Sequence, residues 1–131
     1  MSQHDAIAAC TALCKAYGEL ADANEADAFA ALYTEDGVFD RLGQLIEGPA
    51  ALRNVIAGRP PGTWSRHVCS NIRIEVDADG RNASGTVDLD MQRGIAGSDE
   101  VQRLQAVYHD RYVLTDAGWR IRLRKVELVP A

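Results

Sequence analysis

Several features that mark other classes of protein are missing from this sequence. No run of about 18 apolar residues occurs, so no helix is expected to span a membrane. The N-terminal segment lacks the basic start and apolar stretch of a secretory signal, which predicts a cytoplasmic protein. A glycine-rich phosphate loop and metal-ligand spacing are also missing, so we expect neither a cofactor nor a metal.

Lysine is scarce and positive charge is not clustered. The chain has only two lysines, Lys15 and Lys125, and its arginines are scattered without forming a basic run. The formal net charge is −5, and an acidic surface repels phosphate backbones. Nucleic acid is therefore not an expected partner.

Cysteine is present in an odd number, three, which argues against a disulfide framework in a chain without a secretory signal. Cys10 and Cys14 lie four residues apart on an apolar helical stripe, so we expect them to be small core residues. A metal site formed by these two cysteines and His67 is the alternative, but no second ligand pair at finger spacing accompanies them.

What is present fits one globular domain of 131 residues, with 47% apolar and 25% charged residues. Apolar spacing predicts a long first helix over residues 3–23. Asn24, with Asp27 three residues on, predicts the start of a second helix that extends to Tyr33. Residues 34–37 are expected to form a turn, and Gly48-Pro49 should open a third helix.

Strands account for the rest of the chain. A hairpin is predicted over residues 38–46, and four antiparallel strands over residues 64–76, 82–92, 100–115 and 119–128. Helices followed by a run of strands predict an α+β fold of order α-α-β-β-α-β-β-β-β. The loops 58–62 and 94–99 are expected to shape the mouth of a pocket.

The order of elements and the local text resemble the nuclear transport factor 2-like superfamily, in its SnoaL-like branch. The resemblance covers nearly the whole chain; the segments that carry it are residues 17–22, 28–39, 48–52, 66–71, 108–112 and 118–121. It implies a single domain over residues 1–131, a cone whose curved sheet wraps around the long N-terminal helix. It also implies an internal pocket for a small, mostly apolar or ring-containing molecule, and a homodimer.

The resemblance also implies site residues. In the members of this superfamily that catalyse eliminations, such as scytalone dehydratase, an aspartate orients a histidine that abstracts a proton; the matching positions are Asp22 and His67. Tyr17 matches a tyrosine five residues before the aspartate, and Arg124 matches an arginine near the C-terminus. A pocket acid is expected at Asp88 or Asp90, where burial and like charge would raise a pKa.

Other positions depart from the family patterns or stay open. The second histidine of scytalone dehydratase is replaced here by Val87 or Asp88. The steroid isomerase base falls on Arg41, next to Asp40.

Asp110 matches the second aspartate of the isomerases. A purely structural interpretation has it pairing with Arg120 or Arg122 across the last hairpin. With Arg124, Phe29 and Trp64, it is expected to bind substrate.

The residues predict acid–base chemistry. A carboxylate beside an imidazole holds its tautomer, and a tyrosine hydroxyl can donate to a developing oxyanion or a leaving group. The first hypothesis is a cofactor-free lyase that carries out a dehydratase-type elimination on a hydroxylated ring compound. An isomerase or polyketide cyclase using the same residues is the second, and a non-catalytic module that binds a small ligand is the third.

Overall fold

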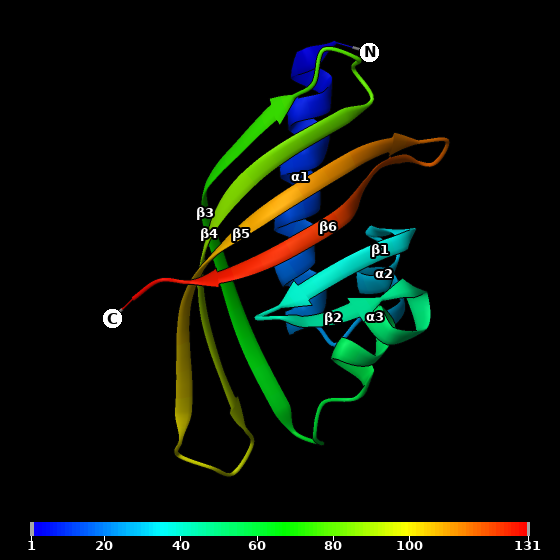
Figure 1. Ribbon diagram of the computed structural model, residues 1–131. Coiled ribbons are helices and arrows are strands. Elements are labelled where there is room, and N and C mark those ends of the chain that lie inside the picture. Colours follow the sequence, from blue (N-terminus) through cyan, green and yellow to red (C-terminus); the bar gives the residue numbers. More distant parts are fainter. Residues whose placement is uncertain (1, 131) are drawn as a thin grey trace.

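The computed structural model describes residues 2–130 and contains three helices and one six-stranded sheet. The sheet order is β2-β1-β6-β5-β4-β3. Figure 1 shows α1 running along one side of the curved sheet, with α2 and α3 beside β1 and β2. In chain order the elements are α1 (Gln3–Asp22), α2 (Ala26–Ala30), β1 (Tyr33–Arg41), β2 (Gln44–Glu47), α3 (Gly48–Ala57), β3 (Thr63–Val76), β4 (Asn82–Ile95), β5 (Val101–Thr115) and β6 (Gly118–Leu128).

The predicted α+β class is confirmed. β3 to β6 pair antiparallel in sequence order, whereas β1 pairs parallel with β6, so the sheet is mixed. Among the described residues, no helix is long and apolar enough to cross a bilayer.

The first helix begins and ends close to where its apolar spacing predicts. Ser2 and Asp5 form a reciprocal capping box, with the Ser2 hydroxyl accepting from the Asp5 amide at 3.1 Å. The stripe that faces the sheet includes Cys10 and Cys14, both fully buried, which confirms that they are core residues. Burial of this stripe fixes α1 against the inner face of the sheet.

The prediction of the second helix was wrong at both ends. Asn24 adopts a left-handed φ of 59°, which is not the extended conformation of an N-cap residue, and α2 covers only Ala26–Ala30. Tyr33 does not end the helix, because it pairs with Ile121 of β6 at the start of β1. The turn expected over residues 34–37 is instead an irregular stretch within β1. Tertiary pairing with β6 overrides the local helical pattern here.

A bulge in β6 changes which side chains face inwards. Arg111 pairs with Leu123 and Tyr112 with Ile121, so Arg122 is one extra residue between the two pairs. Ile121 is buried before the bulge and Arg124 is buried after it, whereas Arg122 remains exposed. The simple alternation of arginines and apolar residues along this segment therefore does not describe the faces of the strand.

Candidate active site

A cavity of about 620 Å³ lies between α1, α3 and the inner face of the sheet. Its volume falls in the usual range for small-molecule sites. Its interior is formed by buried apolar and aromatic side chains, while the more exposed end is polar. The lining consists of Tyr17, Ala21, Phe29, Phe39, Arg41, Leu42, Val55, Ile56, Arg59, Ser65, His67, Leu89, Met91, Arg93, Gln102, Arg103, Leu104, Tyr108 and Val126.

The predicted carboxylate–imidazole pair is present: His67 lines the cavity, and Asp22 lies behind it without lining the cavity. Nδ1 of His67 lies 2.6 Å from Oδ1 of Asp22, and the side chain of His67 is only 9% exposed. An ionised carboxylate can only accept, so the proton of a neutral imidazole lies on Nδ1 and leaves Nε2 with its lone pair. No described residue hydrogen-bonds to Nε2, so this nitrogen can act as a base toward a molecule in the cavity.

Asp22 is held at the junction of α1 and β3. Its Oδ2 accepts from the backbone amide of His67 at 2.9 Å, and its Oδ1 accepts from the hydroxyl of Ser65 at 2.8 Å. Gly18, one helical turn earlier, allows the close approach, because a Cβ there would lie 2.8 Å from Cβ of His67. Asp22 is therefore fixed by β3 itself and does not merely cap a helix.

Arg59 supports this arrangement from the loop after α3. It donates to the Ser65 hydroxyl at 3.0 Å, to the Ala21 carbonyl at 2.9 Å and to the side chain of Asn24. Its Nε is buried without a hydrogen-bond partner among the described residues. The sequence predicted a pocket rim over residues 58–62, and Arg59 does line the cavity, but its link to Asp22 through Ser65 carries no sequence signal.

Tyr17 and Phe29 both line the cavity, as predicted. Their rings pack with centroids 4.5 Å apart, and the Tyr17 hydroxyl lies 2.9 Å from that of Tyr33. Burial, with a contribution from Tyr33, raises the pKa of Tyr17 well above its ordinary value, and Arg124 counteracts part of this shift. Tyr17 therefore stays a neutral phenol at physiological pH and can donate a hydrogen bond.

Asp110 and Arg124 form a fully buried ion pair behind the cavity wall. Two hydrogen bonds join them, Nε to Oδ1 at 2.8 Å and Nη2 to Oδ2 at 2.6 Å. The interpretation that pairs Asp110 with Arg120 or Arg122 is corrected, because the β6 bulge brings Arg124 inwards instead.

The guanidinium of Arg124 lies between the rings of Tyr17 and Tyr108, at 4.3 and 4.0 Å from their centroids. Neither Arg124 nor Asp110 lines the cavity, so any influence on a bound molecule passes through these tyrosines.

Asp88, Asp90 and Trp64 lie on the other face of the sheet, so the expectation that they reach the pocket is wrong. Neighbouring Leu89 and Met91 point inwards, and alternation along β4 turns both aspartates outwards. Asp88 accepts from Asn71, and hydrogen bonds from Arg103 hold the pKa of Asp90 below its ordinary value. Trp64 is 37% exposed.

Neither Arg41, which stands at the position of the isomerase base, nor the neighbouring Asp40 is arranged as a base toward the cavity. Asp40 accepts from the backbone amide of Gly43 at 2.9 Å and so closes the turn between β1 and β2, while Arg41 lines the cavity. Across residues 2–130, no group of three or more histidine, cysteine or acidic side chains is arranged to hold a metal ion.

Sequence comparison gives the family. The family model described as SnoaL-like domain matches residues 2–125 of this chain. The chain belongs to the SnoaL-like domain family. No curated protein matches this chain.

Solved structures extend the likeness of this SnoaL-like chain. A variant of Rv3472, a protein of unknown function from Mycobacterium tuberculosis, is 28% identical with a TM-score of 0.87, over 98% of this chain and 75% of that one. A scytalone dehydratase-like protein from Novosphingobium aromaticivorans is 20% identical with a TM-score of 0.83, over 93% and 83% of the two chains. A hexachlorocyclohexane dehydrochlorinase, LinA-type3 from Novosphingobium barchaimii, is 17% identical with a TM-score of 0.81, over 94% and 86%. At these last two identities the likeness concerns the fold alone. A structure from Novosphingobium aromaticivorans described as an NTF2-like protein, 24% identical with a TM-score of 0.83 over 97% and 84% of the two chains, gives that fold its name: the nuclear transport factor 2-like fold.

Proposed function

We propose that this SnoaL-like protein is a lyase that eliminates water from a hydroxylated ring compound, with His67 as the base. The observation that carries the proposal is the 2.6 Å contact of Asp22 with His67, whose side chain lines a mostly apolar cavity. Two structural neighbours, the scytalone dehydratase-like protein and the dehydrochlorinase, are named for eliminations. These names support the reaction class and leave the substrate open.

The proposed reaction has a simple atom balance. Nε2 of His67 takes a proton from carbon, the electron pair of that bond forms the double bond, and the neighbouring carbon–oxygen bond breaks. The proton held by His67 then joins the departing hydroxide to give water. Asp22 stabilises the imidazolium that forms between these events, because its carboxylate already accepts from Nδ1.

Tyr17 has a supporting part in this proposal. Tyr17 lines the cavity and burial keeps its phenol neutral, so in this proposal its hydroxyl turns from Tyr33 to donate a hydrogen bond to the leaving oxygen or to a carbonyl that activates the carbon acid. An isomerase of the steroid type is less well supported, because Asp40 is engaged in the β1–β2 turn. The same histidine could still move a proton without loss of water, and product mass separates the two reactions.

The proposal is tested with purified protein and a panel of hydroxylated steroids, terpenoids and aromatic polyketides. Product mass lower by one water identifies the lyase. His67→Ala should lower kcat by about 10²–10⁴-fold, and Asp22→Asn should lower it by a smaller factor because the tautomer is no longer held.

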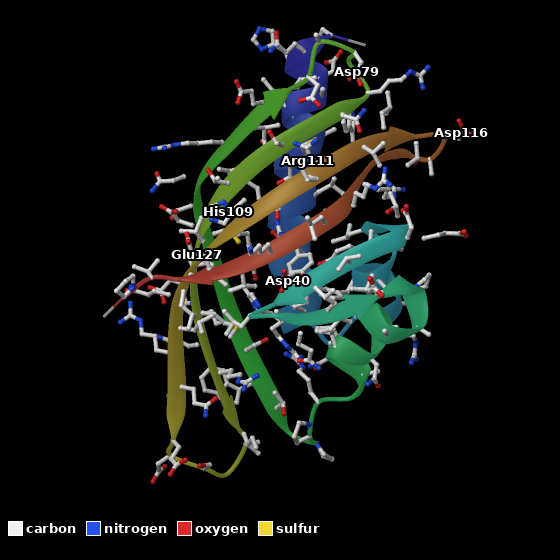
Figure 2. The ribbon with its side chains drawn as sticks, viewed as in Figure 1. Asp40, Asp79, His109, Arg111, Asp116 and Glu127 are labelled. Atoms are coloured by element: carbon white, nitrogen blue, oxygen red, sulfur yellow. The ribbon has the colours of Figure 1, made fainter. Side chains whose placement is uncertain are left out.

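His109 provides the matched control, because it is exposed on the outer face of the sheet beside Glu127, with 3.1 Å between Nε2 and Oε1 (Figure 2). His109→Ala should leave turnover unchanged. Full turnover in His67→Ala would refute the proposal, as would products of unchanged mass.

A further inference from the structure

The cavity has an unusual distribution of charge. Four arginines line it, Arg41, Arg59, Arg93 and Arg103, whereas none of the described lining residues is an aspartate or glutamate. The chain as a whole carries a formal net charge of −5. Positive charge is therefore concentrated in one cleft of an acidic protein, and a cleft with low-dielectric walls strengthens such a field.

These arginines come from separate segments of the chain that all line the cavity. Arg41 ends β1, Arg59 is in the loop after α3, and Arg93 and Arg103 belong to the β4–β5 hairpin. Figure 1 shows these segments in the lower half of the molecule. Arg41, Arg93 and Arg103 are exposed, whereas Tyr17 and Phe29 at the other end are buried. The arginines therefore mark the mouth, and the aromatic residues mark the interior.

Three of the four guanidinium groups have no carboxylate partner among the described residues. Arg103 is ion-paired with Asp90 at 2.6 Å, but Arg41 and Arg93 donate only to the neutral amides of Gln44 and Gln102.

Arg59 donates to neutral oxygens and leaves its buried Nε unpaired. Asp22 attracts Arg59 but does not form an ion pair with it. The two carboxylate oxygens of Asp22 accept hydrogen bonds from His67 and Ser65 instead.

Arg59 and Arg93 are also close enough to repel each other. Burial lowers the pKa of Arg59, Asp22 opposes this change, and repulsion from Arg93 adds to the lowering. Asp22 offsets part of this repulsion, but neither Arg41 nor Arg93 has an ion-pair partner among the described residues, so an anion that binds beside them is favoured. A carboxylate fits this role, because its two oxygens match the paired donors of a guanidinium.

We propose that the substrate of this cavity is a ring compound that carries a carboxylate, with the apolar ring in the aromatic interior and the carboxylate at the arginine mouth. This inference rests on the proposed function, because it names the class of substrate that the same cavity binds. The carboxylate anchors one end of the molecule, so the reacting carbon is held beside His67 between the anchor and the interior wall. Arg93 and Arg41 are then specificity-determining residues.

The test compares two fluorescent ligands of the same shape, anthracene carboxylate and anthracene carboxamide, in titrations of the whole protein. The carboxylate should bind about tenfold more tightly than the amide, since a charge-assisted hydrogen bond is roughly twice as strong as a neutral one. Its affinity should fall as sodium chloride rises from roughly 0.05 to 0.5 M, because the mouth is exposed and salt screens it. The affinity for the amide should not change with salt.

Variants locate the effect. Arg93→Gln and Arg41→Gln should each weaken the carboxylate by about three- to tenfold and leave the amide unchanged. Arg111→Gln is the charge-matched control, because Arg111 is exposed on β5 away from the cavity (Figure 2) and should affect neither ligand. Equal affinity for the two ligands, equal loss in Arg93→Gln and Arg111→Gln, or failure of both ligands to bind would each overturn the inference.

The lyase function and the charge preference fail separately. His67→Ala should keep the preference for the carboxylate, since the base does not contact it in this arrangement. Loss of the preference in a protein that still eliminates water refutes only the substrate class. A preserved preference without elimination from any substrate refutes only the lyase function.

Discussion

At the scale of single residues, the buried pair of Asp110 and Arg124 connects stability with the site. Burial disfavours the charge of Arg124, but the attraction of Asp110 outweighs this, so the pKa of Arg124 stands above its ordinary value. Tyr112 and Cys14 contact the same cluster, and the guanidinium supports the rings of Tyr17 and Tyr108. The pair thus fixes the wall behind the proposed hydrogen-bond donor.

Removing one member of this pair should be far more damaging than removing both. Arg124→Met leaves a buried carboxylate uncompensated and should lower the free energy of unfolding by about 3–5 kcal/mol, measured by urea titration. The double variant Asp110→Asn with Arg124→Met should recover part of this loss, because no buried charge remains. A loss below about 1 kcal/mol in Arg124→Met would show that the pair is not the constraint described here.

At the scale of elements, the position of the base depends on how closely α1 approaches β3. The absence of a side chain at Gly18 brings the helix against His67, and Asp22 on the following turn then reaches both the imidazole and the backbone of β3. The β6 bulge has a similar effect on the other side of the cavity, since it turns Arg124 inwards. One glycine in a helix and one bulge in a strand therefore determine where the side chains of the site lie.

Gly18→Ala should have opposite effects on stability and on activity, because helix propensity favours alanine whereas the packing against His67 does not. Alanine is favoured over glycine in a helix by about 1 kcal/mol, so propensity alone predicts a more stable protein. The new Cβ would meet Cβ of His67 at 2.8 Å and must displace it, so we expect kcat to fall at least about tenfold.

Exposed Ala12 on the same helix gives the control for propensity. Ala12→Gly should cost about 1 kcal/mol and leave kcat unchanged. If Gly18→Ala is more stable and fully active, the close packing of α1 against His67 has no functional consequence.

At the scale of the whole molecule, the core around α1 contains many neutral acids. Burial is the main cause that raises the pKa of Cys10 to about 12, and it also raises the pKa values of Cys14, Tyr17, Tyr108 and Tyr112. These groups stay protonated in the folded state above the pH at which they ionise in the unfolded chain.

The homodimer implied by the family resemblance stays a prediction.

Stability should therefore fall in alkali. A folded pKa above the unfolded one gives stability that is complete below the unfolded pKa and is lost as pH rises toward the folded value. For Cys10 this window extends from about 9 to about 12. The free energy of unfolding, measured by urea titration at successive pH values, should decline across it. Cys10→Ala should make the decline less steep, and an unchanged slope would contradict this assignment.

The sequence by itself determined much of this protein. The periodicity of apolar residues predicted α1 and most of the strands, and Gly48-Pro49 predicted the start of the third helix. The resemblance to the family predicted that Asp22 pairs with His67. These features depend on local periodicity or on a motif, and both can be read without knowing the register of the sheet. The fold class and the central dyad followed from them.

Only the tertiary structure decided which side chains reach the cavity. Asp88 and Asp90 lie on the outer face because the β3–β4 register turns Leu89 inwards, and a shift of one residue reverses every side chain of a strand. Arg124 is buried because of a bulge that alternation cannot reveal. Arg59 reaches the end of α1 from a loop 35 residues after Asn24 in sequence. Local pattern predicts most of the elements, though not α2 or the start of β1, whereas register, bulges and long-range contacts determine which residues form the site.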